Sequence, residues 1–344
     1  MHVGISKQKV KIQEYLGEIK MVTTVERLSP TTQESLHIRG LLNEIMNNDA
    51  LRLQESFLEN SIIYAQELPR RIREIFYQFK HNESSSVLLV TKNPVLLDGP
   101  GPTPNRHIEM DHDYKLNDAQ ILHGLYGSLL GEAIGFTSQR GGSVYNNLMP
   151  LSNYSSISNS SSGSKLDFGF HVEDAFHPAR ADYLGLVCLR NDENAATTIS
   201  SIDGIQLTDK EKEVLFQPNF YISHNPIHTT NNVINEEGQP ILFGHPDHPY
   251  IRINIASMNL DRYQGIERIA LEKIITHFEK NVTAVVLASR DCIFIDNYRC
   301  VHGRNAFDAS YGENARWLSR VVFTNDLRKS SAIRHSCSSR QIAA

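Results

Sequence analysis

Residues 166–178 read LDFGFHVEDAFHP, and this stretch decides how the rest of the chain is interpreted. An alternating apolar run, LDFGF, leads directly into His171 and Glu173. Side chains two residues apart on a strand point to the same face, so an imidazole and a carboxylate are expected to project together from one wall of a sheet or barrel. Joined by a distant histidine, such a pair forms the facial triad that holds ferrous iron and leaves positions open.

The spacing alone is weak evidence, because the same His-x-acid pattern occurs four times. Besides His171 and Glu173, the pairs are His81/Glu83, His107/Glu109 and His245/Asp247. These three lie in polar or proline-containing segments and are most simply surface residues. A carboxylate buried behind LDFGF would be costly without a partner, and either a metal or hydrogen bonds would satisfy it. The local sequence leaves both interpretations open.

Residues 293–328 supply the remaining groups. His302 lies far enough after His171 for the chain to return on another strand of one barrel. Arg316 opens the strand-like run RWLSRVVF, and Arg320 follows four residues later. Arginines that point into a barrel are expected to bind carboxylates. A guanidinium stays charged when it is buried, and it can donate two parallel hydrogen bonds to one carboxylate. The His-x-Glu pair, the distal His and the downstream arginines are together far more specific than any one of them.

Composition excludes several classes of protein. The 344 residues carry 34 Lys and Arg against 39 Asp and Glu, a net charge of −5, so a basic surface for nucleic acid is not expected. The longest apolar runs are strand-sized, which argues against a membrane-spanning helix. The first 20 residues lack the pattern of a signal peptide. A cytoplasmic protein with reduced cysteines is therefore expected.

The chain begins with helical patterns and continues with short strands. Amphipathic runs fill much of residues 31–80, and Asn117 or Asp118 is expected to begin a buried helix. From about residue 135 the sequence alternates between short apolar segments and polar loops, interrupted by one helix at 265–281. This order predicts a mainly β fold, an antiparallel sandwich or barrel with helical support. A long segment, residues 224–250, is expected to close over a substrate as a lid.

At this point the sequence resembles the clavaminate-synthase-like iron(II)/2-oxoglutarate oxygenases that hydroxylate free amino acids, including the arginine hydroxylases of viomycin biosynthesis and related asparagine and lysine hydroxylases. The resemblance rests on GEAIGFTSQ, HVEDAFHPARADYLGLVCLRN, FIDNYRCVHGR and RWLSR, and it covers most of the chain. It implies a double-stranded β-helix, or jelly roll. Residues 1–20 would be an extension to a single oxygenase domain at 21–344, with helical support at about 25–135 and the jelly-roll core at about 136–325.

The resemblance also implies roles for individual residues. His171, Glu173 and His302 match the iron ligands, and Arg316 matches the residue that binds the distal carboxylate of 2-oxoglutarate. Iron(II), 2-oxoglutarate and O2 would be required, with ascorbate as a reductant. His177, past the predicted strand, is expected to be structural or to support the ligands from outside the ligand set, because three ligands already serve the metal.

Further matches concern the amino-acid substrate. Arg320 resembles the partner of its α-carboxylate, while Gln139 and Ser161 occupy positions that contact its backbone. Glu173 is expected to help hold its amine.

One departure bears on the substrate. Where arginine hydroxylases of this family carry two aspartates that grip the guanidinium, this sequence has Asn254 and Ala256. Each charge-assisted hydrogen bond lost would cost roughly 1.5 to 3 kcal/mol, so lysine is slightly favoured over arginine or a neutral polar amino acid. Candidate partners for a lysine ammonium are Glu132, Asp247 and Asp261.

The expected reaction is hydroxylation of C3 or C4 of a free L-amino acid. Alternatives are the same chemistry on an aminoacyl group tethered to a carrier protein, and desaturation. A non-catalytic jelly-roll binding protein is the alternative from a different class; failure to bind iron would favour it.

Overall fold

The computed structural model describes residues 23–96, 99–105, 114–157, 160–223 and 237–343. A short strand and three helices come first: β1 (Val25–Leu28), α1 (Thr32–Met46), α2 (Gln54–Ala65) and α3 (Arg70–Asn82). Side-chain caps begin two of the helices, and the start expected at Asn117 is confirmed. The Thr31 hydroxyl accepts from the Glu34 N–H at the start of α1, and the Asn117 side chain caps α4 (Asp118–Ser128).

The strands form two main sheets. The larger contains β1, β2 (Val87–Val90), β3 (Glu132–Phe136), β4 (Asn146–Leu148), β6 (Tyr183–Arg190), β11 (Cys292–Asp296), β13 (Trp317–Thr324) and β14 (Gln341–Ile342). Its strand order is β1-β2-β11-β6-β13-β3-β14, with β4 paired to β13. The smaller contains β5 (Phe168–His171), β7 (Ala196–Ser201), β10 (Thr283–Val286) and β12 (Cys300–Arg304), in the order β10-β7-β12-β5.

The two sheets enclose an apolar interior. Along β11, Ile293 and Ile295 face this interior with Ile199 of the smaller sheet, whereas Cys292 and Phe294 face the opposite way. This alternation is the period-two pattern of a strand that is buried on both faces. Two facing sheets around a shared core form the predicted jelly roll.

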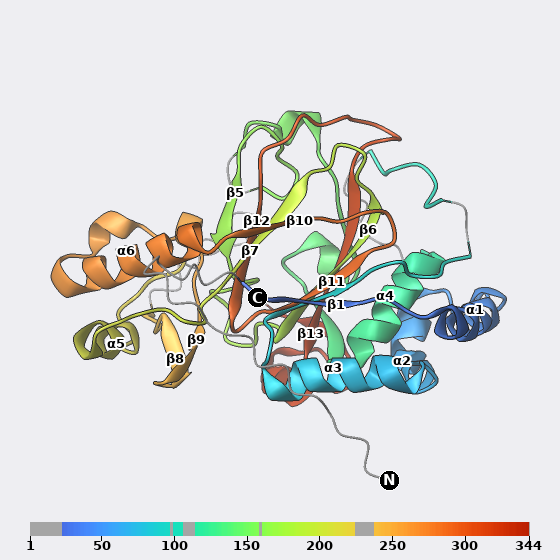
Figure 1. The fold of residues 1–344 in the computed structure, drawn as a ribbon, viewed down its shortest axis with the longest axis horizontal. Helices are drawn as coiled ribbons and strands as arrows, with labels where there is room; N and C mark the ends of the chain where they lie inside the picture. The colour runs from blue at the N-terminus through green and yellow to red at the C-terminus, as the bar shows by residue number, and fades with distance from the viewer. Residues whose placement is uncertain (1–22, 97–98, 106–113, 158–159, 224–236, 344) are drawn as a thin grey trace, which may run out of the picture.

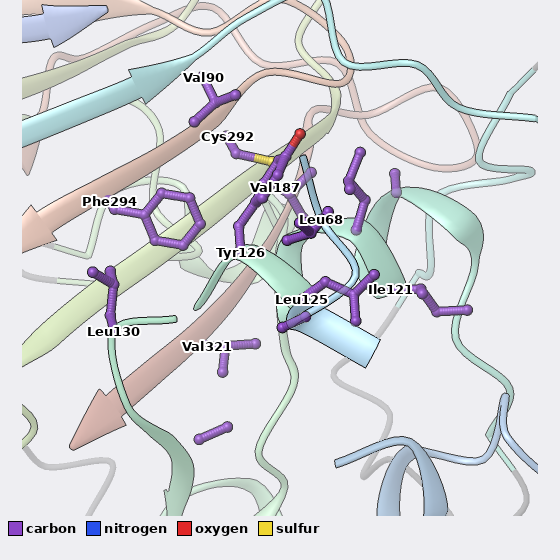
Figure 2. Close-up of a cluster of buried hydrophobic side chains, with 14 of the residues drawn as sticks. Leu68, Val90, Ile121, Leu125, Tyr126, Leu130, Val187, Cys292, Phe294 and Val321 are labelled. Atoms are coloured by element: carbon purple, nitrogen blue, oxygen red, sulfur yellow. The ribbon is translucent and has the colours of Figure 1, made fainter. Parts of the chain in front are cut away.

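Helices α1 to α4 cover the outer face of the larger sheet (Figure 1). Figure 2 shows the contact, in which Ile121, Leu125 and Tyr126 of α4 pack toward Val187 and Phe294. The helical first part of the chain thus stiffens one wall of the jelly roll, as predicted.

A second helical group lies at the opposite side of the molecule (Figure 1). It comprises α5 (Asp209–Leu215), α6 (Gly265–Lys280) and the hairpin of β8 (Leu242–His245) and β9 (His248–Ile251). Helix α6 confirms the helix predicted at 265–281, although two of its apolar side chains, Ile266 and Ile269, are exposed. None of the helices in the described parts of the chain is long and apolar enough to cross a membrane.

The predicted lid divides into two parts. Residues 224–236, like the extension at 1–20, lie outside the described residues, while the remainder includes the β8–β9 hairpin. Phe243 and Tyr250 of this hairpin pack against Tyr298, with ring centroids 5.3 and 5.7 Å apart. Closure over a substrate stays a prediction.

Candidate metal centre

Strand pairing brings two distant histidines together. His171 ends β5, and His302 lies directly opposite it on the antiparallel neighbour β12. Their ring centroids are 4.2 Å apart. The next residue, Gly303, is required for this approach, because a Cβ there would lie 2.3 Å from the Phe168 carbonyl oxygen.

Glu173 joins the histidines from a turn rather than from the strand. Strand β5 ends at His171, so the expectation that both side chains lie on one strand was wrong for Glu173. The chain is nevertheless held extended beyond β5, because the Val172 N–H donates to the Ile253 carbonyl at 2.9 Å. The carboxylate therefore still projects beside the two imidazoles.

The three side chains are arranged as a metal site. One potential ligand atom from each of His171, Glu173 and His302 lies within 4.8 Å of the others, and all three residues are buried. His171 Nδ1 is 2.9 Å from the Gly169 carbonyl oxygen, which selects the tautomer that leaves Nε2 to bind a metal. Two imidazoles and a carboxylate are the donor set that suits ferrous iron with open positions.

The protonation states agree with this role. Burial, reinforced by the neighbouring His302, lowers the pKa of His171 to about 4, so its imidazole is neutral at pH 7. Burial acts to raise the pKa of Glu173, but the charge of Arg320 and a hydrogen bond with His302 outweigh it and hold that pKa well below its ordinary value. A neutral imidazole and an ionised carboxylate are the forms that bind a metal.

A buried arginine faces the same cavity. Arg316 is 4% exposed and lines the cavity together with the three potential ligands. Within the described residues it makes no hydrogen bond or ion pair, and its Nε is buried without a partner. Burial lowers its pKa to about 10, so the guanidinium is still charged at neutral pH. Such a buried cation requires an anionic ligand, and a carboxylate can accept two parallel hydrogen bonds from the guanidinium.

A second arginine connects the metal centre to the cavity wall. Arg320 of β13 lines the same cavity and donates to the Glu173 carboxylate and, at 2.6 Å, to Gln139 Oε1. Gln139 Nε2 donates in turn to the Asp174 carboxylate at 2.8 Å. The chain Glu173–Arg320–Gln139–Asp174 therefore fixes the orientation of the Gln139 amide.

The loop that contains Ser161 forms another part of the cavity wall. Ser161 lines the cavity and is half-buried. Buried Arg304 of β12 holds this loop by donating to the carbonyls of Gly163 and Leu166. Asn254 lines the cavity too and forms a β-bridge with His171.

Comparison with known proteins supplies the family. Residues 95–322 match the family described as taurine catabolism dioxygenase TauD, TfdA. The chain belongs to the TauD/TfdA family. The matched region contains the three potential metal ligands together with Arg316 and Arg320.

Relatives in this TauD/TfdA family include amino-acid hydroxylases. The chain is 34% identical to the enduracididine β-hydroxylase of Streptomyces hygroscopicus, covering 83% of this chain and 90% of the relative. It is 26% identical to the L-ornithine/L-arginine 3-hydroxylase of Catenulispora acidiphila, covering 90% and 97%. The crystal structure of the non-haem iron oxygenase OrfP with Fe and α-ketoglutaric acid superposes with a TM-score of 0.80 at 27% identity, covering 92% of this chain and 99% of that one.

The cavity of this TauD/TfdA protein brings together most of the residues singled out from the sequence. His171, Glu173, His302, Arg316, Arg320, Gln139, Ser161 and Asn254 all line it. His177 does not line it. Its Nε2 lies 3.0 Å from the Ala343 carbonyl oxygen, which agrees with the predicted structural role.

The three acids suggested for a lysine ammonium are absent from the described cavity wall. Glu132 pairs with Arg340 at 2.6 Å, and the side chains of Asp247 and Asp261 are 75% and 97% exposed. Among cavity residues that sequence reasoning missed are Asp174 and Arg140. Asp174 directly follows a potential ligand, a signal that could have found it.

Proposed function

We propose that this TauD/TfdA protein is an iron(II)- and 2-oxoglutarate-dependent hydroxylase of a free L-amino acid, acting at C3 or C4. The observation that carries the proposal is one cavity containing a His–Glu–His centre and a buried arginine without an acidic partner in the described chain. His171, Glu173 and His302 would hold the iron, and Arg316 would bind the distal carboxylate of 2-oxoglutarate. When bound, these groups activate O2 as 2-oxoglutarate is decarboxylated to succinate.

The protein's own contribution is positioning and the exclusion of water. Arg320 would bind the substrate α-carboxylate, and Glu173 and Gln139, which accept hydrogen bonds from Arg320, would receive the amine. Ser161, on the loop held by Arg304, would contact the amino-acid backbone. An amino acid bound in this way would present the first carbons of its side chain toward the metal.

The names of the relatives guide the choice of carbon and substrate. The relatives that are 34% and 26% identical over most of their lengths are a β-hydroxylase and a 3-hydroxylase, which favours C3. Lysine 4-hydroxylases at 28% identity keep C4 and lysine open. Because Asn254 and Ala256 stand where the family's arginine hydroxylases carry two aspartates, arginine is one candidate among ornithine, lysine, enduracididine and neutral polar amino acids.

The proposal is tested by anaerobic reconstitution with Fe(II), followed by 2-oxoglutarate, ascorbate, O2 and a panel of these free L-amino acids. Mass spectrometry should find one amino acid that gains a single oxygen atom, with an equivalent amount of succinate. Both signals should disappear in His171→Ala, and at a 2-oxoglutarate concentration near the wild-type KM they should fall strongly in Arg316→Ala. Formation of succinate without any altered free amino acid would refute the proposal of a free amino-acid substrate. Absence of metal binding would refute the proposal that the protein is an enzyme.

A further inference from the structure

Asn297 is joined to the backbone of a proposed metal ligand. Its side chain is fully buried, and Oδ1 accepts from the Glu173 N–H at 2.7 Å. Its Nδ2 donates to the carbonyl of Glu173 at 3.0 Å and to that of Ala181 at 2.9 Å. One amide therefore satisfies both backbone polar groups of Glu173, a residue that lies beyond the end of β5.

The position of Asn297 links this contact to a second ligand. Asn297 lies in the turn between β11 and β12, and β12 carries His302 five residues later. The turn is held on several sides: the Asn297 N–H donates to the Asp182 carbonyl, and the Ile251 N–H donates to the Tyr298 carbonyl.

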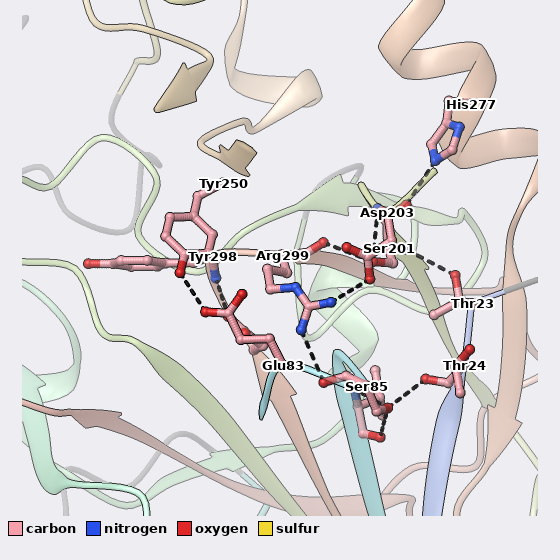
Figure 3. A network of polar contacts seen from close by, with 12 residues as sticks. Thr23, Thr24, Glu83, Ser85, Ser201, Asp203, Tyr250, His277, Tyr298 and Arg299 are labelled. Carbon is pink, nitrogen blue, oxygen red and sulfur yellow. Dashed lines mark hydrogen bonds and ion pairs between the residues drawn. The ribbon is translucent and has the colours of Figure 1, made fainter. Parts of the chain in front are cut away.

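A polar network fixes the turn further (Figure 3). Arg299 donates to Asp203 at 2.7 Å and to the Ser85 carbonyl at 3.3 Å. The Ile202 N–H also donates to the Arg299 carbonyl. These contacts hold the turn in place and connect it to segments next to both sheets.

We infer that Asn297 is a positioning residue for the metal centre, which sets the location of Glu173 relative to His302. Glu173 has left the strand ladder, so its backbone groups depend on this side chain for their hydrogen bonds. Without Asn297, the turn at 173–176 would be free to shift, and the carboxylate would move relative to the imidazoles. Partners outside the ligand set commonly contribute about 10- to 100-fold to metal affinity.

The chain provides a matched control at Asn191. This asparagine is also buried and makes the same three kinds of bond, accepting from the Ala195 N–H and donating to the carbonyls of Ala195 and Leu287. It does not line the cavity. Asn191→Ala therefore removes an equivalent set of bonds without touching a proposed ligand.

The experiment compares the wild type, Asn297→Ala and Asn191→Ala. Mn(II), a stable substitute for Fe(II), is titrated with electron paramagnetic resonance detection, and thermal unfolding is measured on the same samples. Both variants should unfold at lower temperature, but only Asn297→Ala should bind Mn(II) about 10- to 100-fold more weakly. It should also show a weaker charge-transfer absorption with Fe(II) and 2-oxoglutarate under anaerobic conditions.

Two outcomes would overturn the inference: Mn(II) affinity of Asn297→Ala within twofold of wild type, or an equal loss in Asn191→Ala. If Asn297→Ala does not fold, Asn297→Ser and Asn191→Ser replace the pair, because serine keeps a hydroxyl but is too short for three contacts. The inference rests on the proposed iron site. Failure of the wild type to bind Mn(II) would refute that site, whereas binding that is insensitive to Asn297 would refute only the positioning role.

Discussion

His171 and His302 are paired residues on neighbouring antiparallel strands, and Glu173 Oε2 lies 3.3 Å from His302 Nε2. The site therefore depends on the register between β5 and β12. A shift of one residue in either strand would turn one imidazole to the opposite face of the sheet. The pairing of β5 with β12 therefore determines the geometry of the metal centre.

Replacement of either histidine should abolish metal binding. His171→Ala leaves one imidazole and one carboxylate, and we expect its Mn(II) affinity to fall by more than about 100-fold, beyond the usual effect of outer partners. His245→Ala is the control, because His245 and Asp247 have the same His-x-acid spacing but lie exposed in a hairpin. Equal affinities of wild type and His171→Ala in a Mn(II) titration would contradict the assignment.

Arg316 should determine the affinity for 2-oxoglutarate. Loss of one charge-assisted contact of about 1.5 to 3 kcal/mol predicts that Arg316→Met raises the KM for 2-oxoglutarate roughly 10- to 150-fold. Arg316→Lys should recover part of this loss, since the charge remains but the fork does not. Arg180→Met is the control, because Arg180 is a buried arginine that does not line the cavity. It should lower thermal stability without changing the KM for 2-oxoglutarate; a change in both variants would argue against a specific role.

Asp174 should act on the amino-acid substrate through Gln139. Asp174→Asn exchanges the acceptor of the Gln139 amide for a group that can also donate, so Gln139 is no longer held in one orientation. A hydrogen bond of this kind predicts a rise of roughly 3- to 10-fold in the KM for the amino acid, with the KM for 2-oxoglutarate unchanged. Steady-state kinetics with each substrate varied in turn separates the two effects. Asp326→Asn is the control, because Asp326 is partly exposed and does not line the cavity. A uniform fall in kcat alone would count against this path.

The sequence predicted the composition of the site better than its geometry. His171 and Glu173 could be recognised because they come directly after the alternating apolar run LDFGF. The two arginines could be recognised because they lie four residues apart in the strand-like run RWLSRVVF. The i, i+2 rule placed Glu173 on the strand, but β5 ends two residues earlier and Asp174 adopts a left-handed backbone, with φ of 50°. The carboxylate reaches the histidines because Asn297 and Ile253 hold the turn, and neither contact leaves a periodic signal.

Strand β12 illustrates the same limit. Its residues, CVHGR, lack an apolar alternation, and the sequence indicated only that His302 lies far enough after His171 to reach another strand of one barrel. The segment is a strand because it pairs with β7 and β5 on both sides, so tertiary contacts override local preference. The suggested ammonium partners were wrong for a related reason: sequence gives no measure of where a loop carboxylate such as Asp261 will point.

The last prediction concerns a buried histidine outside the site. His123 of α4 is fully buried, stacks on Phe294 and, in the described structure, has no hydrogen-bond partner at either ring nitrogen. Burial lowers its pKa to about 3. Because the unfolded chain binds this proton near pH 6.5 and the folded chain does not, the stability is fully present above that pH and is lost as the pH falls toward 3.

Replacing His123 with leucine should therefore flatten the acid side of the stability profile. Between pH 7 and pH 4.5, the free energy of unfolding of the wild type should fall by about 2 to 3 kcal/mol more than that of His123→Leu. Urea unfolding of metal-free protein at several pH values measures this difference, and groups common to both proteins, including His171 and Glu173, cancel from it. The exposed His245→Ala should follow the wild-type curve. Parallel curves for wild type and His123→Leu would show that His123 does not set the acid sensitivity.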